Sequence, residues 1–332
     1  MTLLFSSAFR SPISALMRLV AMVATCLWTL TACVAEDLPA YKAELVVEGW
    51  IEDEGYPVVL LTETVPVTSV SQSADDLEDR LLRWAVVRIS DGTDTVTLTG
   101  RYDRGYFPPY IYTTSRMKGR AGRTYTLSVE VDERQATATT TIPARPQVSD
   151  WRIEALPDCD TLFTVKALIN DPADDKNYYQ LFARTGKEAR QFLPSLMGSI
   201  DDDVMDGATW VSIYRGQKLG SGRYTPYFRP GDTLAVKVAQ VDAEAFRFWD
   251  DYSQLLTEGN NILLAPQQNV RGNICGGQGC WYGLSAVTRY AICTRVPILF
   301  SPGQGEDAMD NGAEWAAEGQ FPGRVYGAGH NN

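Results

Sequence analysis

The sequence has almost no histidine: its 332 residues include one, His330. A Ser-His-Asp or Cys-His enzyme needs an imidazole as general base, and many zinc sites need one as a ligand. The composition therefore argues against hydrolases of these classes and against histidine-ligated metals. Phosphate-binding loops and dinucleotide fingerprints are also missing, because the glycine-rich runs do not open a helix. We expect no enzyme activity, no bound metal and no cofactor.

Positive charge is scarce as well. The chain has 30 Lys and Arg residues against 41 Asp and Glu residues, and its formal net charge is -11 at pH 7. A nucleic-acid partner needs a basic surface, so this balance argues against one. The 45% hydrophobic and 21% charged residues are those of a folded globular protein rather than a disordered one. Two domains are the default expectation at this length.

The start of the chain lacks acidic residues before Glu36. An apolar run covers residues 19–32 and follows Arg10 and Arg18. The run is shorter than the roughly 20 apolar residues that span a bilayer. A basic start, a short apolar middle and an end with small residues are typical of a secretory signal.

The end of this run is more specific. Leu30, Thr31, Ala32 and Cys33 resemble the lipobox of bacterial lipoproteins, whose cysteine is acylated and becomes the new N-terminus. We predict a lipoprotein signal peptide over 1–32, lipidation of Cys33 and a tether over 33–43. An ordinary signal peptide that ends near a cysteine is the alternative. Acyl chains hold a protein on a membrane by burying methylene groups.

The segment 44–142 consists of short Val-, Leu- and Thr-rich runs separated by turns. In 124–131, the apolar residues alternate with polar ones, which predicts a strand with one buried face. Residues 122–125 resemble the tyrosine corner of immunoglobulin-like sandwiches, and 73–82 has the pattern of a helix. We predict an immunoglobulin-like β-sandwich with further strands over 44–51, 57–65, 83–90, 95–99 and 135–142.

Two prolines mark a linker over 143–146, and a second β-sandwich domain is predicted over 147–300. Behind the N-cap residue Asp242, apolar residues recur at helical spacing to 256, so we expect one amphipathic helix packed on the sheet. The tail 301–332 should be flexible. Strands are predicted over 150–155, 161–169, 177–184, 209–214, 233–241 and 284–295. The expected fold is thus mainly all-β, with two tandem antiparallel sandwiches.

An exported chain meets an oxidising compartment, in which cysteines commonly form disulfides. Four cysteines follow Cys33 in the sequence. Cys275 and Cys280 bracket a tight glycine-rich turn, and Cys159 and Cys293 would join the start of the second domain to its last strand. We predict these two disulfides, although four cysteines allow three pairings. A four-thiolate metal site is the alternative, but the spacing lacks the usual Cys-x-x-Cys pairs.

Aromatic residues crowd around Pro108 and Pro109. If they form an exposed loop, they would bind sugars, peptides or a protein partner, and otherwise they fill the edge of the sandwich. Acidic residues gather in 171–177 and 201–206, but neither segment has the ligand spacing of an EF-hand, and solvated turns are favoured over calcium loops. The aromatic binding candidates are Tyr102, Tyr106, Phe107, Tyr110 and Tyr112.

Several segments after Cys33 together resemble the domain-of-unknown-function family 4249, a family of Bacteroidota outer-membrane lipoproteins. They include ELVVEGWI, GRAGRTYTLSVEV, NYYQLF, GDTLAVKVAQVDAEAFRFWDDY and NVRGNICGGQGCWYGLSAVTRYAI, in this order. The resemblance implies an outer-membrane lipoprotein with a TonB-dependent receptor as partner. It carries over no catalytic residue, and only Cys33 maps onto a family position. The acidic pair Glu36 and Asp37 after Cys33 resembles the export signal of Bacteroidota surface lipoproteins, which predicts exposure to the cell exterior, and a solvated charged tether is the alternative.

The function expected from these features is that of a non-catalytic binding or accessory component of a TonB-dependent uptake system. A structural or adhesive surface lipoprotein is the second hypothesis. A glycoside hydrolase that works with paired carboxylates needs no histidine and is the third, but the sequence shows no such pair.

Overall fold

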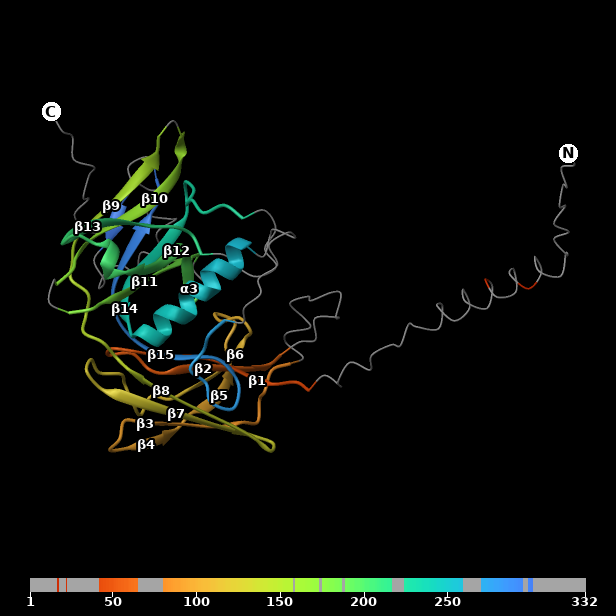
Figure 1. Cartoon of the computed structure of the whole chain (residues 1–332). Coiled ribbons are helices and arrows are strands. Elements are labelled where there is room, and N and C mark those ends of the chain that lie inside the picture. Colours follow the sequence, from red (N-terminus) through yellow and green to blue (C-terminus); the bar gives the residue numbers. More distant parts are fainter. Residues whose placement is uncertain are drawn as a thin grey trace, which may run out of the picture. The chain divides into compact units, whose positions relative to one another are not determined.

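In the part of the chain that the structure describes, the fold is built from three β-sheets and one long helix (Figure 1). The structure, a computed structural model, describes residues 42–64, 80–157, 159–172, 175–186, 189–216, 224–258, 270–294 and 298–300, together with the isolated residues 17 and 22. The described residues from 43 onward cluster as one compact unit. The mainly β fold with a helix in its second half confirms the expected fold class. The immunoglobulin-like character of the first half stays a prediction.

The largest sheet has nine strands in the order β12-β11-β14-β15-β1-β2-β6-β5, with β16 paired to β15. Its strands are β1 (Leu45–Glu52), β2 (Val58–Glu63), β5 (Thr99–Tyr102), β6 (Tyr110–Thr113), β11 (Tyr178–Thr185), β12 (Leu193–Asp201), β14 (Thr233–Val241), β15 (Gln278–Ile292) and β16 (Ile298–Phe300).

Two smaller sheets complete the β-structure. The four-stranded sheet has the order β4-β3-β7-β8 and the three-stranded sheet the order β13-β10-β9. Their strands are β3 (Val86–Ser90), β4 (Thr95–Thr97), β7 (Thr124–Val131), β8 (Arg134–Thr141), β9 (Val148–Leu156), β10 (Cys159–Asn170) and β13 (Ala208–Ile213). Strand β7 has the predicted bounds, because its apolar residues alternate strictly with polar ones.

The two faces of the large sheet are covered differently. Along β15, Trp281 belongs to the core shared with the four-stranded sheet, and Ala291 to the core shared with the three-stranded sheet. The neighbours Cys280 and Tyr282 point to the opposite face, where they contact the helix α3 (Ala243–Glu258). Both small sheets therefore pack on one face, and α3 lies on the other, as Figure 1 shows.

Strands from both predicted domains belong to the large sheet. β15 pairs in parallel with β1, with Trp281 opposite Gly49, and in antiparallel register with β14. The prolines of the predicted linker at 143–146 thus lie between two parts of the chain whose strands are hydrogen-bonded to each other in the large sheet. A parallel pairing between strands so far apart in sequence leaves no local signal, which is why the composition suggested two separate sandwiches.

Helix α3 is positioned by the residue that the sequence marks as its N-cap. Asp242 Oδ1 accepts a hydrogen bond from Ala245 N at 2.9 Å. The same carboxylate reaches β8, because Thr140 Oγ1 donates to Asp242 Oδ2 at 2.7 Å. Trp249 and Tyr252 pack toward Tyr282 and Phe182, so their predicted role in the core is confirmed.

The structure contains neither predicted disulfide, because Cys275, Cys280 and Cys293 are free thiols. Cys275 forms two backbone hydrogen bonds with Thr137 of β8, whereas Cys280 is buried against α3. Burial raises the pKa of Cys293 to about 12, so this thiol stays protonated. The prediction of the Cys275–Cys280 and Cys159–Cys293 pairs is corrected accordingly.

The glycines between Cys275 and Cys280 instead allow this segment to approach neighbouring backbone segments closely. A Cβ at Gly276 would lie 2.2 Å from the carbonyl oxygen of Gln135, and one at Gly279 would lie 2.0 Å from that of Val47. Both glycines also have positive φ angles of 91° and 105°. The segment carries the chain from the edge of β8 to its pairing with β1.

Several predictions concern residues outside the described part of the chain. These are the signal peptide over 1–32, most of the tether over 33–43, the lipidation of Cys33, the core of the 73–82 helix and the tail over 301–332. They stay predictions. Within the described residues, no helix is long and apolar enough to span a membrane.

Candidate functional site

The face of the large sheet that carries α3 also has an open cleft of about 210 Å³. Strands β1, β11, β14 and β15 provide its floor, and the loop after β5 and the segment before β12 provide its walls. Its lining includes Trp50, Glu52, Tyr56, Tyr106, Arg190, Phe192, Lys237 and Tyr282. We call this feature the aromatic cleft.

Aromatic rings form a continuous wall in the aromatic cleft. The Trp50 ring lies 6.1 Å from that of Tyr106 and 6.3 Å from that of Tyr282, at interplanar angles of 37° and 29°. On the other side, Lys237 Nζ lies 4.2 Å from the centre of the Phe192 ring. Such rings offer a large apolar surface with little conformational freedom to lose on binding.

The charged residues of the cleft are paired. Lys237 Nζ lies 2.6 Å from Glu52 Oε2, which joins β14 to β1, and only 9% of the Lys237 side chain is exposed. Arg190 Nη1 lies 3.3 Å from Asp103 Oδ2 in the loop after β5. A buried ammonium needs such a partner, since an unpaired charge is costly to remove from water. The lining of the cleft is therefore apolar where the aromatic rings lie and polar at the two ion pairs, Lys237–Glu52 and Arg190–Asp103.

Glu48 is the unusual acid of this region. It lies on the same face of β1 as Trp50 and Glu52, because side chains alternate along the strand. Burial raises the pKa of Glu48 to about 7, although the hydrogen bond from Gln191 lowers it. Gln191 Nε2 donates to Glu48 Oε1 at 3.1 Å. Near neutral pH, Glu48 therefore exists in both protonation states.

Gln191 also fixes the aromatic loop. Its Oε1 accepts a hydrogen bond from Phe107 N at 3.0 Å, and the oxygen of Gly105 accepts from the backbone N–H groups of Arg190 and Gln191. A side chain at Gly105 would collide with Arg190, with a Cβ 2.5 Å from its Cγ. These contacts join the loop of the first half of the chain to the segment before β12.

The five aromatic candidates from the sequence lie in different environments. Tyr106 lines the cleft, and Tyr102 and Phe107 are exposed by 54% and 42%. Tyr110 packs edge-on against Tyr112. Tyr112 is buried in the core, and its hydroxyl donates to Leu82 O at 2.6 Å. Both expectations therefore hold for part of the set: Tyr102 and Phe107 are exposed, whereas Tyr112 fills the edge of the sandwich.

Most residues of the site were not predicted as candidates, among them Glu48, Trp50, Gln191 and Lys237. The signal that marks β1 was present in the sequence, since Glu48 and Glu52 interrupt an apolar strand at even spacing. A glutamate in a central strand is costly unless it has a partner. Gln191 and Lys237 gave no comparable signal, because their partners are far away in the chain.

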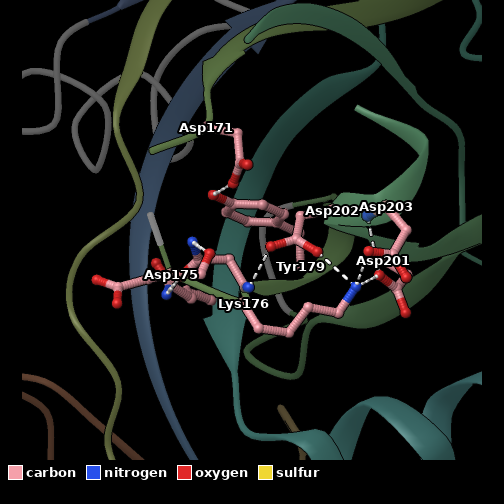
Figure 2. A network of polar contacts seen from close by, with 9 residues as sticks. Asp171, Asp175, Lys176, Tyr179, Asp201, Asp202 and Asp203 are labelled. Atoms are coloured by element: carbon pink, nitrogen blue, oxygen red, sulfur yellow. Dashed lines mark hydrogen bonds and ion pairs between the residues drawn. The ribbon is translucent and has the colours of Figure 1, made fainter. Parts of the chain in front are cut away.

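The two acidic clusters of the sequence come together around Lys176 (Figure 2). Its ammonium contacts the carboxylates of Asp201, Asp202 and Asp203. Loss of water lowers the pKa of Lys176, but the three carboxylates outweigh this and raise it above its usual range. The group that faces these acids is thus a cation of the chain itself, as expected for a structural turn.

A second contact strengthens this turn. Asp202 Oδ2 accepts a hydrogen bond from Asn177 N, and Tyr179 donates its hydroxyl proton to Asp171 Oδ1 at 2.7 Å (Figure 2). The acids of 171–177 and 201–203 therefore hold the loop before β11 against the end of β12.

Comparison with known proteins identifies one family. The family model described as Domain of unknown function (DUF4249) matches residues 34–289. This match covers both halves of the described fold and the residues that line the aromatic cleft. A search of curated proteins finds no match to the chain.

Proposed function

The chain belongs to the DUF4249 family, and from this premise we propose that it is a non-catalytic, lipid-anchored binding protein of the bacterial outer membrane. It would face the cell exterior and serve a TonB-dependent uptake system as an accessory component. The lipobox that ends at Cys33 supports the anchor. The aromatic cleft is the observation that carries the binding role.

The lining of the cleft favours a small ligand that is apolar on its faces and polar at its rim. Ring faces such as those of Trp50 and Tyr106 pack against the C–H groups of a sugar ring, while charged groups at fixed positions bond to its hydroxyls. Lys237 with Glu52, and Arg190 with Asp103, are such groups. We therefore propose a saccharide as the ligand class.

The acids near the cleft do not favour a glycoside hydrolase. Such an enzyme needs two carboxyl groups on either side of the scissile bond, about 5.5 Å apart in retaining enzymes and roughly 6.5–9.5 Å apart in inverting ones. Within the described residues, Glu52 is the acid in the lining of the cleft, and Lys237 engages its carboxylate. These features support binding without catalysis.

Exposed aromatic side chains favour a second candidate, an adhesive surface lipoprotein. Trp84 is 92% exposed, and Tyr102 and Phe107 also present their rings to solvent. Exposed rings of this kind mark surfaces that contact other macromolecules. In that case, the loop surface would bind and the cleft would not.

Binding to a glycan array, followed by calorimetry with the saccharides that bind, tests the cleft. Trp50→Ala and Tyr106→Ala should each weaken binding by about tenfold or more, because truncating an aromatic anchor of a binding site costs about 2 kcal/mol or more and about 1.4 kcal/mol corresponds to tenfold in affinity. Tyr102→Ala is the matched control, since its ring is exposed outside the cleft. Loss of binding in Tyr102→Ala alone would favour the adhesive candidate.

The membrane part of the proposal has its own test. Labelling of cells with palmitate should mark the protein, and Cys33→Ser should release it from the outer membrane. Affinity purification from outer membranes should recover a TonB-dependent transporter. An unlabelled protein that stays in the membrane after Cys33→Ser would refute the anchor, and purification without any transporter would refute the role in uptake.

A further inference from the structure

A second cavity lies on the other side of the segment that precedes β12. Residues of this extended segment alternate between the two cavities: Arg190 and Phe192 line the aromatic cleft, whereas Ala189, Gln191 and Leu193 line the second one. The second cavity has a volume of about 280 Å³. Its chemistry differs from that of the aromatic cleft.

Three arginines are among the residues that line this cavity. Arg184 comes from β11, Arg215 follows β13, and Arg229 lies in the turn before β14. We call this cavity the arginine pocket. Its lining includes no Asp or Glu within the part of the chain that the structure describes. In a protein with a net charge of -11, this local excess of positive charge is a specific feature.

One nearby carboxylate compensates only part of this charge. Asp232 Oδ2 accepts hydrogen bonds from Arg215 Nη2 and from Arg229 N, each at 2.8 Å. These bonds fix the turn and hold Arg215 in place. Tyr224 contributes as well, because its hydroxyl donates to Arg215 O. The pocket is therefore built by defined contacts within the protein.

Two of the arginines also have buried donors. The Nε–H groups of Arg184 and Arg215 are buried and have no hydrogen-bond partner among the described residues. The Arg184 guanidinium lies 5.0 Å from the centre of the Phe192 ring, which limits its freedom to turn toward solvent. A buried N–H donor without a partner is costly, and an anion that accepts a hydrogen bond from it would remove this cost.

We propose that the arginine pocket binds the oxyanion group of a small solute: a carboxylate, a sulfate or a phosphate. Planar guanidinium groups match such oxyanions with two parallel hydrogen bonds each. Thr185 and Thr225 add neutral polar groups to the lining for the rest of the solute. This site is separate from the proposed saccharide site, and neither proposal depends on the other.

Calorimetry on the purified protein at low ionic strength tests the proposal. The probes are glucuronate, inorganic sulfate and inorganic phosphate, with glucose as the uncharged counterpart of glucuronate. At least one anion should bind with a stoichiometry of one, and added salt should weaken that binding. Stronger binding of glucuronate than of the inorganic ions would identify a carboxylate-bearing sugar, and the reverse order a bare oxyanion.

Two variants locate the bound anion. Arg229→Gln and Arg184→Gln should each weaken anion binding by about tenfold or more, because charge-assisted hydrogen bonds are lost. Arg116→Gln removes the same charge from an exposed loop far along the chain and should leave the affinity unchanged. Since Arg184 lies in a strand, Arg229→Gln remains informative if the other variant does not fold.

The proposal is overturned by either of two results. One is that none of the anions binds to the folded wild-type protein at low ionic strength. The other is that Arg229→Gln and Arg116→Gln weaken binding equally, which would show a general effect of net charge. Loss of saccharide binding in Trp50→Ala, with anion binding retained, would confirm that the two sites are distinct.

Discussion

Acidic side chains gather in two regions of this protein, and the two regions use them in opposite ways. Around Lys176, three exposed or half-buried aspartates meet one ammonium. Near the aromatic cleft, Glu48 is half-buried and receives a hydrogen bond from the neutral amide of Gln191. The dense acidic cluster is compensated within the chain, whereas the single glutamate is not.

This difference reverses the pKa shifts of the two regions. Burial alone would raise the pKa of Asp201, but hydrogen bonds from Lys176 and Asp203 N lower it below its usual value. Burial dominates at Glu48, and its pKa rises to about 7. The local environment, rather than the density of charge in the sequence, thus separates a structural turn from a candidate site.

The largest expected effect concerns Glu48 and pH. Between pH 4.5 and about 7, the folded protein keeps a proton on Glu48 that the unfolded chain releases, so stability falls as pH rises through this range. The loss should reach about 3 kcal/mol. Glu48→Gln should remove this slope. Urea unfolding from pH 4.5 to 8, compared between wild type and variant, measures it.

A second variant sharpens this test. Gln191→Leu removes the hydrogen bond that lowers the pKa of Glu48, so the decline in stability should continue to higher pH than in the wild type. Identical pH profiles for Glu48→Gln and the wild type would contradict the raised pKa. They would also remove the contrast between the two acidic regions.

The next effect in size concerns the ion pair beside Glu48. Lys237→Met should destabilise the protein by about 2 kcal/mol, because Glu52 loses its partner while its side chain is only 27% exposed. The cation–π contact with Phe192 is lost as well. Chemical denaturation at pH 7 measures the free energy of unfolding.

The double variant Lys237→Met with Glu52→Leu is the control. Replacing both partners by apolar side chains removes the unpaired charge, so most of the lost stability should return. If the double variant is as unstable as the sum of the two single variants, the pair is not coupled, and packing alone explains the loss.

Local patterns in the sequence were sufficient to predict much of the fold. The alternation in 124–131 predicted the bounds of β7, and Asp242 predicted the start of α3. These elements depend on neighbours in the chain, which leave periodic signals. The pairing of β1 with β15 depends on residues more than two hundred positions apart, and no such signal records it.

The candidate site was predicted only in part, for the same reason. The aromatic loop drew attention to Tyr106, because five rings crowd around two prolines. Trp50, Lys237 and Arg190 come from β1, β14 and the segment before β12, and only the sheet order brings them to one cleft. The prediction of the Cys275–Cys280 disulfide was wrong because the glycines between the two cysteines were assigned to a hairpin that the disulfide would close. In the structure, these glycines instead let the chain pass close to the backbones of β8 and β1.

The smallest expected effect belongs to Lys176. Its side chain is solvated, so Lys176→Gln should lower the melting temperature less than Lys237→Met does, and high salt should reduce the difference from the wild type. The lowered pKa of Asp201 makes its contribution present above pH 3.8 and lost as pH falls further, which is the opposite slope to that of Glu48. Thermal unfolding from pH 2.5 to 7 measures both properties. A loss as large as that of Lys237→Met, or one that salt does not change, would show that the acidic turn behaves as a buried network and that the contrast between the two regions is wrong.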